Sequence, residues 1–446
     1  MARHAMNPKA SLTAIAFAAG WLLPAAAAPL GATPLQEAEP VLLANIMINF
    51  STPDYSGAWR GWNYGNDMVR HDPERRDAEG RRDIASVYYP AVGPYDMRDP
   101  RTAEYHCQLM RMAGIDGGVF DVAFFSDPNA RGKNASFSRE VVDNYLRAFA
   151  AYGLKGVVMF EQKAHWLWNA KLTSRAATAR AALADLDAWL RRFEPVQYAI
   201  GERPLVFMFS YAETTPNRGE SRLRPEELLD WRRRFPPEDT PVIAVQWFDD
   251  AYQEVHEGIF EWPAIKGLPE PGSDVLRYNS PEKEREIWED RHAALYRHLA
   301  SGRYTFIAGG VWPGFDDEGC MGWGEGRRII PREDGDIYAY HWGRMIASRY
   351  PVVQIVTWND WFEGTNIEPA EEYGTQYLAL TRKFAAHWRG DAAPEGNLEV
   401  PVWIYKLRKG NHAEAARAAA QAAEAIRHGQ FTIAEELIEP YRALVQ

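Results

Sequence analysis

Two carboxylic acids, Asp360 and Glu363, stand among aromatic residues in the segment 357–369. Hydrolysis of a glycosidic bond requires one carboxylic acid that protonates the leaving oxygen and a second carboxylate that acts as base or nucleophile. The neighbouring Trp358 and Trp361 could wall a pocket of low dielectric in which one of the two acids keeps its proton near neutral pH. An isolated Asp-x-x-Glu is usually a pair of solvated loop acids or helix N-cap residues, so the aromatic surroundings carry the prediction of a catalytic pair.

The apolar run at residues 352–356, directly before these acids, has the length and β-branched composition of a buried strand. Both acids then emerge where that strand ends, and in a barrel of parallel strands this is the end at which active sites lie. Positions three apart on a strand point to opposite faces, but beyond the strand the backbone turns and both side chains can converge on one pocket. Asn359, Trp358 and Trp361 are predicted to contact substrate in that pocket.

Strand-like and helix-like segments alternate from residue 41 onward, which is typical of βαβ units and a parallel sheet. The predicted strands are 41–50, 117–122, 156–161, 204–209, 241–247, 258–265, 304–311 and 352–358. The predicted helices are 101–113, 139–152, 174–193, 225–235, 281–300, 336–348 and 373–387, and the link 249–257 has to supply a short fifth helix. This count predicts an α/β fold of the (β/α)8 TIM-barrel type over residues 40–390. A doubly wound open sheet is the competing architecture, but the Gly-rich phosphate turn that usually follows its first strand is absent from the sequence after residue 50.

Two segments lie outside the barrel pattern. Residues 51–98 are rich in aromatic and turn residues with little periodicity, which predicts an insertion at the barrel mouth that faces the substrate. Residues 391–446 are predicted to form a small C-terminal appendage. It consists of a linker at 391–396, an extended segment at 398–407, and two helices at 413–427 and 432–445.

The N-terminus predicts export. Arg3, His4 and Lys9 precede an apolar stretch at 12–23 that is followed by four alanines, so residues 1–32 are interpreted as a signal peptide and leader. The mature protein is then expected in the periplasm or outside the cell. No later segment approaches about twenty uninterrupted apolar residues, so no membrane span is expected in the mature protein.

Composition narrows the class of partner. The chain has 50 Lys plus Arg against 61 Asp plus Glu, a net charge of −11, which argues against a nucleic-acid binder and favours a neutral or cationic substrate over a polyanion. Cys107 and Cys320 are the two cysteines, and a disulfide between them is possible after export. Neither a Cys-x-x-Cys nor a Cys/His cluster at zinc spacing occurs, so no metal or cofactor is expected.

Other residues are predicted to bind sugar from strand ends or loops. Polar candidates at strand ends are Asp121, Glu161, Gln246, Asp316 and Asp317. Aromatic and imidazole candidates are Trp312, Tyr88, Tyr95 and His165, the last together with Trp166 and Trp168. Each polar candidate could equally be a buried residue satisfied by the backbone, and each ring could equally be core. Glu368, which precedes Pro369, is predicted to be structural.

The segment 358–369, Trp-Asn-Asp-Trp-Phe-Glu-Gly-Thr-Asn-Ile-Glu-Pro, resembles the signature of glycoside hydrolase family 99, the endo-α-mannosidases and their relatives. Segments 93–100 and 312–317 are similar to two further segments of that family, so the resemblance covers about residues 88–388. It implies a (β/α)8 barrel and metal-independent hydrolysis of an α-linked sugar with retention of configuration. Glu363 matches the general acid/base of the family. Asp360 matches its other catalytic glutamate, a base toward the substrate's 2-hydroxyl through an anhydro-sugar intermediate.

The chain also departs from the family pattern. Asp360 is about one methylene shorter than the glutamate it replaces, and Phe362 stands where the endo-mannosidases carry a histidine. The run Trp358-Asn359-Asp360 also looks like that of family 71, the α-1,3-glucanases. The expected substrate is therefore an α-linked oligosaccharide or polysaccharide, mannan-like or glucan-like. Two alternatives stand beside it: a carbohydrate-binding or polysaccharide-processing barrel that has lost the chemistry, and a hydrolase for an unusual pentose or deoxy sugar.

Overall fold

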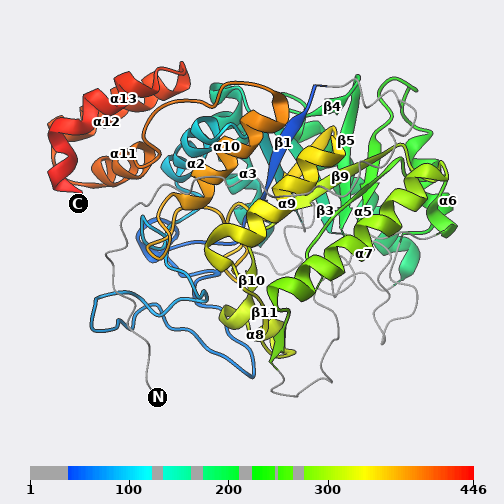
Figure 1. Cartoon of the computed structure of the whole chain (residues 1–446), viewed down its shortest axis with the longest axis horizontal. Helices are drawn as coiled ribbons and strands as arrows, with labels where there is room; N and C mark the ends of the chain where they lie inside the picture. The colour runs from blue at the N-terminus through cyan, green and yellow to red at the C-terminus, as the bar shows by residue number, and fades with distance from the viewer. Residues whose placement is uncertain are drawn as a thin grey trace.

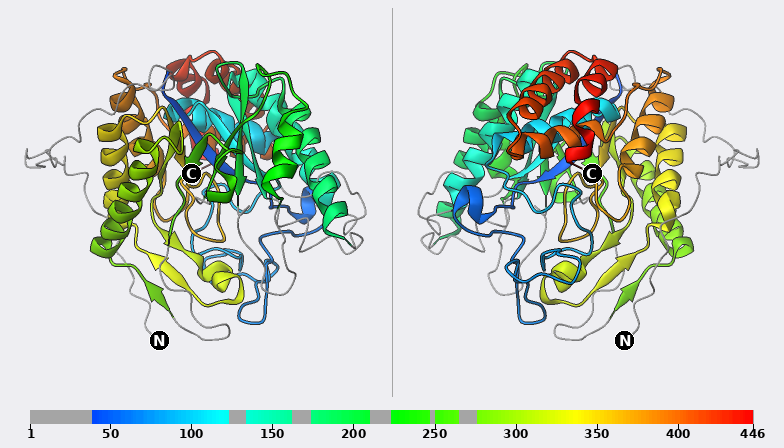
Figure 2. Two further views of the ribbon diagram at one scale, coloured as in Figure 1. Left: turned by 90° about the vertical axis from the view of Figure 1, so that its right-hand side faces the viewer. Right: turned by 90° about the vertical axis from the view of Figure 1, so that its left-hand side faces the viewer.

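The computed structural model describes residues 39–122, 134–161, 174–209, 223–246, 250–264 and 276–445. In this part of the chain, eight parallel strands close into a barrel in the order β3-β2-β1-β12-β9-β7-β6-β5, and β5 pairs again with β3 (Figures 1 and 2). The strands are β1 (Val41–Met47), β2 (Gly117–Val122), β3 (Lys155–Glu161), β5 (Arg203–Phe209), β6 (Val242–Val245), β7 (Gly258–Phe260), β9 (Phe306–Val311) and β12 (Val352–Ile355). A short strand, β4 (Ala199–Ile200), pairs antiparallel with β5. The predicted (β/α)8 barrel is confirmed, and each strand overlaps its predicted range, although β1, β7 and β12 end three to five residues earlier than predicted.

Helices surround the barrel (Figure 2). They are α2 (Pro100–Ala113), α3 (Asn134–Tyr152), α5 (Arg175–Phe193), α6 (Pro225–Arg232), α7 (Pro281–Ala300), α9 (Asp336–Ser348) and α10 (Gln376–Arg389). Helix α2 shows how local sequence sets these limits. Asp99 caps it by accepting the Arg101 N–H at 3.0 Å, Pro100 occupies a first-turn position that needs no N–H, and Gly114 ends it in the left-handed region. The fifth helix expected in 249–257 is a single 3-10 turn, η1 (Asp250–Tyr252).

Two long excursions lie at the same end of the barrel, below it in Figure 2. The first, residues 51–98, contains α1 (Pro53–Ser56) and otherwise consists of turns and isolated bridges. The second follows β9 and carries β10 (Phe315–Asp316), η2 (Asp317–Gly319), α8 (Met321–Gly324), β11 (Arg328–Ile330) and η3 (Glu333–Gly335). With β8 (Arg277–Tyr278) it forms a small sheet in the order β10-β11-β8. Both excursions lie beyond the carboxyl ends of the barrel strands, where the predicted site lies.

The C-terminal appendage corrects one prediction. Residues 398–407, expected to be extended, belong largely to a helix, α11 (Val400–Lys409). Their β-branched and aromatic residues favour a strand locally, but α11 buries nearly all of them against α2 and α12, and tertiary packing outweighs that preference. Pro401 sits in the first turn, where a missing N–H costs little. The predicted helix pair is present as α12 (Ala413–Arg427) and α13 (Phe431–Ile438), followed by the 3-10 segment η4 (Glu439–Leu444).

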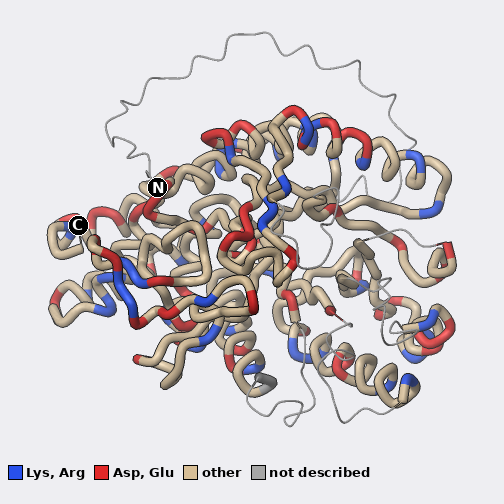
Figure 3. Tube along the Cα trace, turned by 90° about the horizontal axis from the view of Figure 1, so that it is seen from below, with Lys and Arg blue, Asp and Glu red and all other residues tan. Residues whose placement is uncertain are grey.

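Cys107 and Cys320 are both free and buried, so the disulfide considered from the sequence is not formed. Acidic and basic residues alternate around the rim of the barrel end seen in Figure 3. Across the described ranges, no helix is both long enough and apolar enough to cross a membrane.

Candidate active site

The loop after β12 holds Asp360 and Glu363 in one tight turn. The Asp360 N–H donates to Thr357 Oγ1 at 2.8 Å, and the Glu363 N–H donates to Asp360 Oδ1 at 3.0 Å. The Thr357 N–H donates in turn to the Thr365 carbonyl at 3.0 Å, which closes the loop. Both carboxyl groups therefore lie at the carboxyl end of a barrel strand, in a loop that these three hydrogen bonds hold in place.

The same loop is joined to the second excursion. The Asp316 N–H donates to the Glu363 carbonyl at 2.8 Å. Gly364 follows with a φ of +58°, and a Cβ on it would lie 2.7 Å from the Asp316 carbonyl oxygen. A residue without a side chain is needed here both for the left-handed backbone and for the close approach. The excursion is thus held directly against the two acids.

Arg332, which sequence reasoning missed, fastens this loop from the side of η3. Its Nη2 donates to the carbonyls of Gly364 at 3.0 Å and Asn366 at 2.7 Å. Its guanidinium lies over the Tyr88 ring, 4.3 Å from the centroid, and is close to two other tyrosine rings, those of Tyr373 and Tyr377. Tyr88, predicted to bind sugar, is placed on Arg332 in this structure.

Four predicted substrate residues form a buried layer behind the acids. Tyr95, Trp358, Asn359 and Trp361 have no exposed surface. The Tyr95 hydroxyl donates to Glu368 Oε2 at 2.7 Å and accepts from Trp361 Nε1 at 3.0 Å and Asn359 Nδ2 at 3.3 Å. These side chains fill the space between the loop, β1 and α2, so they hold the loop in place and have no free surface for a sugar. Glu368 is structural here, as its position before a proline predicted.

Asn359 joins this layer to the barrel itself. Its Oδ1 accepts the Met47 N–H at 2.8 Å, and its Nδ2 donates to the Met47 carbonyl at 3.0 Å, so it continues the hydrogen-bonding of β1 beyond the strand end. The loop that carries both acids is therefore fixed to the barrel wall by a side-chain amide. This role explains why an asparagine precedes Asp360.

Glu363 meets residues of the second excursion that sequence reasoning missed. The indole Nε1 of Trp323 donates to Glu363 Oε1 at 2.9 Å, and Arg328 Nη2 lies 3.6 Å from the same oxygen. The Trp323 ring contacts the rings of Tyr64 and Phe362, with centroids 5.1 and 5.3 Å away, and is 47% exposed. In the sequence, Trp323 stands among Gly322, Gly324 and Gly326. A lone tryptophan among glycines was the signal that could have identified an exposed ring.

The carboxyls here differ in environment. Asp360 is 5% exposed, and burial, followed by the charge of Glu363, raises its pKa to about 8. Burial also raises the pKa of Asp317 to about 6, although Arg328 opposes it with a 2.5 Å contact from Nε. Burial disfavours the charge of Arg328, but the carboxylates of Glu363 and Asp317 outweigh this and raise its pKa. Asp360 therefore keeps its proton to a higher pH than an exposed aspartate does, while Arg328 contacts Asp317 and lies near Glu363.

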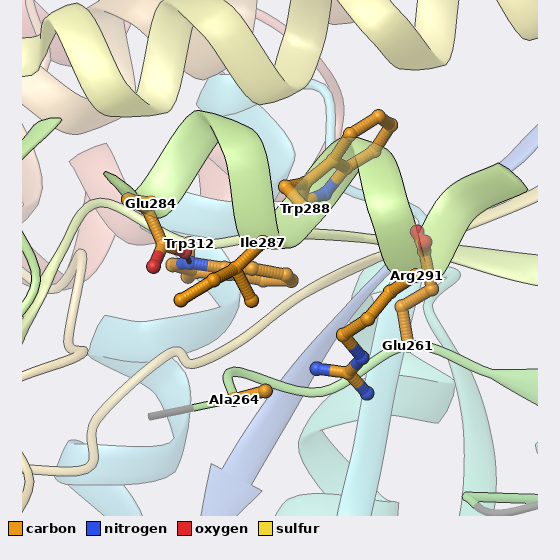
Figure 4. Close-up of a pocket in the computed structure, with 7 residues that line it drawn as sticks. All are labelled: Glu261, Ala264, Glu284, Ile287, Trp288, Arg291 and Trp312. Atoms are coloured by element: carbon orange, nitrogen blue, oxygen red, sulfur yellow. Dashed lines mark hydrogen bonds between the residues drawn. The ribbon is translucent and has the colours of Figure 1, made fainter. Parts of the chain in front are cut away.

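The remaining predicted residues are spread over several places. Asp317 joins the cluster, whereas Asp316 forms a two-pronged contact with Arg327, at 2.9 Å to Nε and 2.7 Å to Nη2. Trp312 donates from Nε1 to Glu284 Oε1 at 2.9 Å. It lines a separate small cavity against α7, together with Glu261 and Arg291 (Figure 4). Trp312 is therefore not part of the Glu363 site.

Three predicted polar residues, Asp121, Glu161 and Gln246, lie at or just beyond the carboxyl ends of β2, β3 and β6, on the same barrel end as the two acids. Asp121 stands level with Met47 in the pairing of β1 and β2. His165, with Trp166 and Trp168, lies outside the described residues. Among the residues that are described, no group of three or more His, Cys, Asp or Glu side chains is placed to hold a metal ion.

Several known proteins are similar in sequence to most of this chain. No protein-family model matches the sequence. Glycoprotein endo-alpha-1,2-mannosidase of Mus musculus is 23% identical over 405 residues, which are 85% of this chain and 82% of that protein. Glycoprotein endo-alpha-1,2-mannosidase-like protein of Homo sapiens is 22% identical over 365 residues, 76% of this chain and 74% of that protein. The solved structure of the GH99 endo-alpha-mannosidase from Bacteroides thetaiotaomicron superimposes with a TM-score of 0.54 at 17% identity, covering 78% of this chain and 97% of that one.

The closed barrel and these relatives point to one class: the chain has a (β/α)8 barrel and is similar to glycoside hydrolases over most of its length. Within that class it is family 99-like, because the homologues and the superimposed structure agree with the likeness read from its motifs. The predicted likeness to family 99 is confirmed. The likeness to family 71 stays a prediction.

Proposed function

We propose that this protein hydrolyses an α-linked glycan with retention of configuration, with Glu363 as the general acid/base and Asp360 as the second catalytic carboxyl. The observation that carries the proposal is the unequal environment of two carboxyls in one loop. The Glu363 side chain is 17% exposed and held by Trp323, whereas Asp360 is almost enclosed, with a pKa of about 8. Two acids whose environments differ in this way can take different roles at one pH, and Asp360 can accept a proton only in its ionised form, which predominates above its pKa of about 8.

Glu363 is suited to exchange a proton with the glycosidic oxygen. Its Oε1 is engaged by the Trp323 N–H, which leaves Oε2 for the substrate. Arg328, 3.6 Å from Oε1, stabilises the carboxylate that forms when Glu363 gives its proton to the leaving group. A carboxyl that is fixed on one side and open on the other is oriented without being blocked.

Asp360 is suited to act as a base on the substrate's 2-hydroxyl. In that step the hydroxyl proton passes to Asp360, its oxygen closes on the anomeric carbon, and the bond to the leaving group breaks as Glu363 protonates it. Water, deprotonated by Glu363, then opens the anhydro sugar, and Asp360 returns the proton to the 2-oxygen. Burial favours neutral Asp360, and therefore makes its ionised form a stronger base than an exposed aspartate.

The substrate we propose first is an α-mannoside, because the relatives that span most of the chain are named as endo-alpha-mannosidases. An α-glucan is the second candidate, since Asp360 and Phe362 depart from the family pattern beside the reacting sugar. We also propose that the protein is exported, on the basis of the leader sequence in residues 1–32.

A panel of defined α-linked manno- and gluco-oligosaccharides tests the proposal. Wild-type protein is expected to release new reducing ends from at least one of them, and NMR of the first product is expected to show the α-anomer. Binding without release from every α-linked glycan would overturn it and favour a carbohydrate-binding barrel. Release restricted to pentosides or deoxy-sugar glycosides would favour the other alternative.

A further inference from the structure

Arg277, in the short strand β8, is a buried arginine that pairs in the sheet with Arg328, the arginine near Glu363. It is 8% exposed. Both of its terminal nitrogens, Nη1 and Nη2, are covered and have no hydrogen-bond partner within the described ranges. A guanidinium presents five donors and stays charged, so its enclosure without a partner opposes folding. Such a group is expected where a ligand supplies the missing partner.

The pairing of β8 with β11 fixes which way Arg277 faces. The two strands are parallel, and Arg277 stands directly opposite Arg328. Residues opposite one another on neighbouring strands project from the same face of the sheet. Arg328 reaches from that face to Asp317 and to within 3.6 Å of Glu363. Arg277 therefore lies beside Arg328 on the face directed at the catalytic acids.

The charges around Arg277 agree with this placement. Burial lowers its pKa, and the positive charge of Arg328 lowers it further, whereas Glu325 and Asp317 act in the opposite direction. Of these two acids, Asp317 is already used, because it accepts both the Nε–H and the backbone N–H of Arg328, at 2.5 and 2.6 Å. The face thus carries two adjacent guanidiniums, of which one is paired within the protein and the other is not.

We propose that Arg277 binds an anionic substituent of the glycan, a carboxylate, sulfate ester or phosphate ester, on a sugar next to the bond that Glu363 cleaves. This deepens the function proposed above and rests on it. Planar, two-pronged recognition of such oxyanions is the contact to which a guanidinium is best suited. The net charge of −11 does not oppose it, because charges farther than about 8 Å are largely screened at physiological salt. The substrate is then an acidic α-linked glycan of low charge density.

Matched glycans and two substitutions test the proposal. Neutral α-linked oligosaccharides are compared with the same backbones carrying a uronic carboxylate, a 6-sulfate or a 6-phosphate, and the three acidic arms identify which oxyanion is preferred. Wild-type kcat/KM is expected to be at least tenfold higher on one acidic glycan than on its neutral counterpart. Arg277→Met is expected to abolish this ratio, and Arg277→Lys to keep part of it.

Arg349→Gln is the control for charge. Arg349 is exposed and precedes β12, at the opposite end of the barrel, so its removal changes the net charge equally and should leave the ratio unaltered. A wild-type preference for neutral glycans would overturn the proposal. So would an Arg277→Met variant that lowers kcat/KM equally on acidic and neutral glycans.

Two measurements do not depend on hydrolysis and separate this proposal from the proposed function. Arg277→Met is expected to have a Tm equal to or above that of the wild type, because it removes an unpaired buried charge. Inorganic sulfate or phosphate, compared with chloride at equal ionic strength, is expected to raise the Tm of the wild type and of Arg349→Gln but not of Arg277→Met. If no glycan is cleaved but this difference is present, the hydrolase assignment fails and the anion site stands. If the anions stabilise all three proteins equally, the anion site fails.

Discussion

The backbone N–H of Glu363 donates a 3.0 Å hydrogen bond to the side chain of Asp360. The two proposed catalytic carboxyls are therefore parts of a single turn, in which one acid caps the backbone of the other. A short side chain is suited to this task, since aspartate accepts from an N–H a few residues ahead more readily than glutamate does. An aspartate at position 360, where the family signature has a glutamate, therefore affects the conformation of the loop as well as the distance that the carboxyl group can reach.

Replacing Glu363 by Gln should remove catalysis while keeping the fold. The amide oxygen can still accept from Trp323 Nε1, but it cannot carry a proton to the leaving group, so kcat should fall by about 10²- to 10⁴-fold. Glu372→Gln is the matched control, because Glu372 is an exposed acid farther along the same loop that pairs with Arg81 of the first excursion. Steady-state kinetics on the cognate glycan and thermal unfolding measure both effects. Near-normal turnover in Glu363→Gln would remove Glu363 from the mechanism.

The pH dependence should reveal which role Asp360 plays. If Asp360 is the base, only its ionised form works, and kcat/KM should rise with pH and level off above its pKa of about 8. If Asp360 instead donates the proton, kcat/KM should fall above that pH. A profile of wild-type kcat/KM between pH 5 and 9.5 distinguishes these outcomes. The Asp360→Asn variant cannot ionise at this position, so it should lose both the activity and the change of kcat/KM near pH 8.

Asp360 should also make the protein less stable as pH rises. Its folded pKa of about 8 lies above the 3.8 of an unperturbed aspartate, so the folded state holds the proton more tightly. The contribution of this group to stability is therefore largest below about pH 4, and it declines between pH 4 and pH 8 by roughly 6 kcal/mol at most. Asp360→Asn removes this decline and can still accept the Glu363 N–H.

Urea unfolding at pH 5 and pH 8 measures this effect. The difference in the free energy of unfolding between the wild type and Asp360→Asn should change between the two pH values. The exposed Asp230, replaced by Asn, is the control and should show no such change. An Asp360→Asn variant with the same pH dependence as the wild type would show that Asp360 is ionised throughout.

Trp323 should contribute through both its N–H and its ring. Phe in its place keeps the contacts with Tyr64 and Phe362 but cannot donate to Glu363 Oε1, so kcat should fall by about tenfold with KM little changed. Ala removes the exposed ring as well and should also raise KM, because flat rings stack on sugar faces. Separate determination of kcat and KM tests this division. Equal effects of both substitutions on KM alone would contradict the positioning role.

Tyr95→Phe should destabilise the loop from behind. It leaves Glu368 Oε2 without its 2.7 Å donor and removes the acceptor for Trp361 Nε1, all in fully buried positions. The free energy of unfolding should fall by about 1–3 kcal/mol, the usual effect of a buried polar group that loses its partner. Chemical denaturation measures it, and Tyr55→Phe, on a half-exposed tyrosine, is the control. An unchanged stability would show that another group satisfies Glu368.

The alternation of apolar and amphipathic segments was enough to predict the barrel, because a strand that is buried on both faces is a continuous run of apolar residues, which can be recognised in the sequence. The segment 352–358 is an example, and its first four residues form β12. Residues 398–407 show the limit of such local reasoning. Their strand-like composition is overridden in α11 by packing against α2 and α12, which no window of ten residues contains.

By itself, the sequence determined the barrel, the place of Asp360 and Glu363 at the end of its last strand, and the likeness to family 99. Those properties depend on residue types at short spacing. Only the tertiary structure decided that Tyr95 and Trp361 are buried supports, and that Trp323 and Arg328 approach Glu363 from 35 to 40 positions away along the chain, with Arg277 paired beside Arg328. Such contacts depend on how an excursion folds back over the barrel, and on which polar groups remain unpaired when it does. These are properties of packing in space, and residue spacing along the chain does not record them.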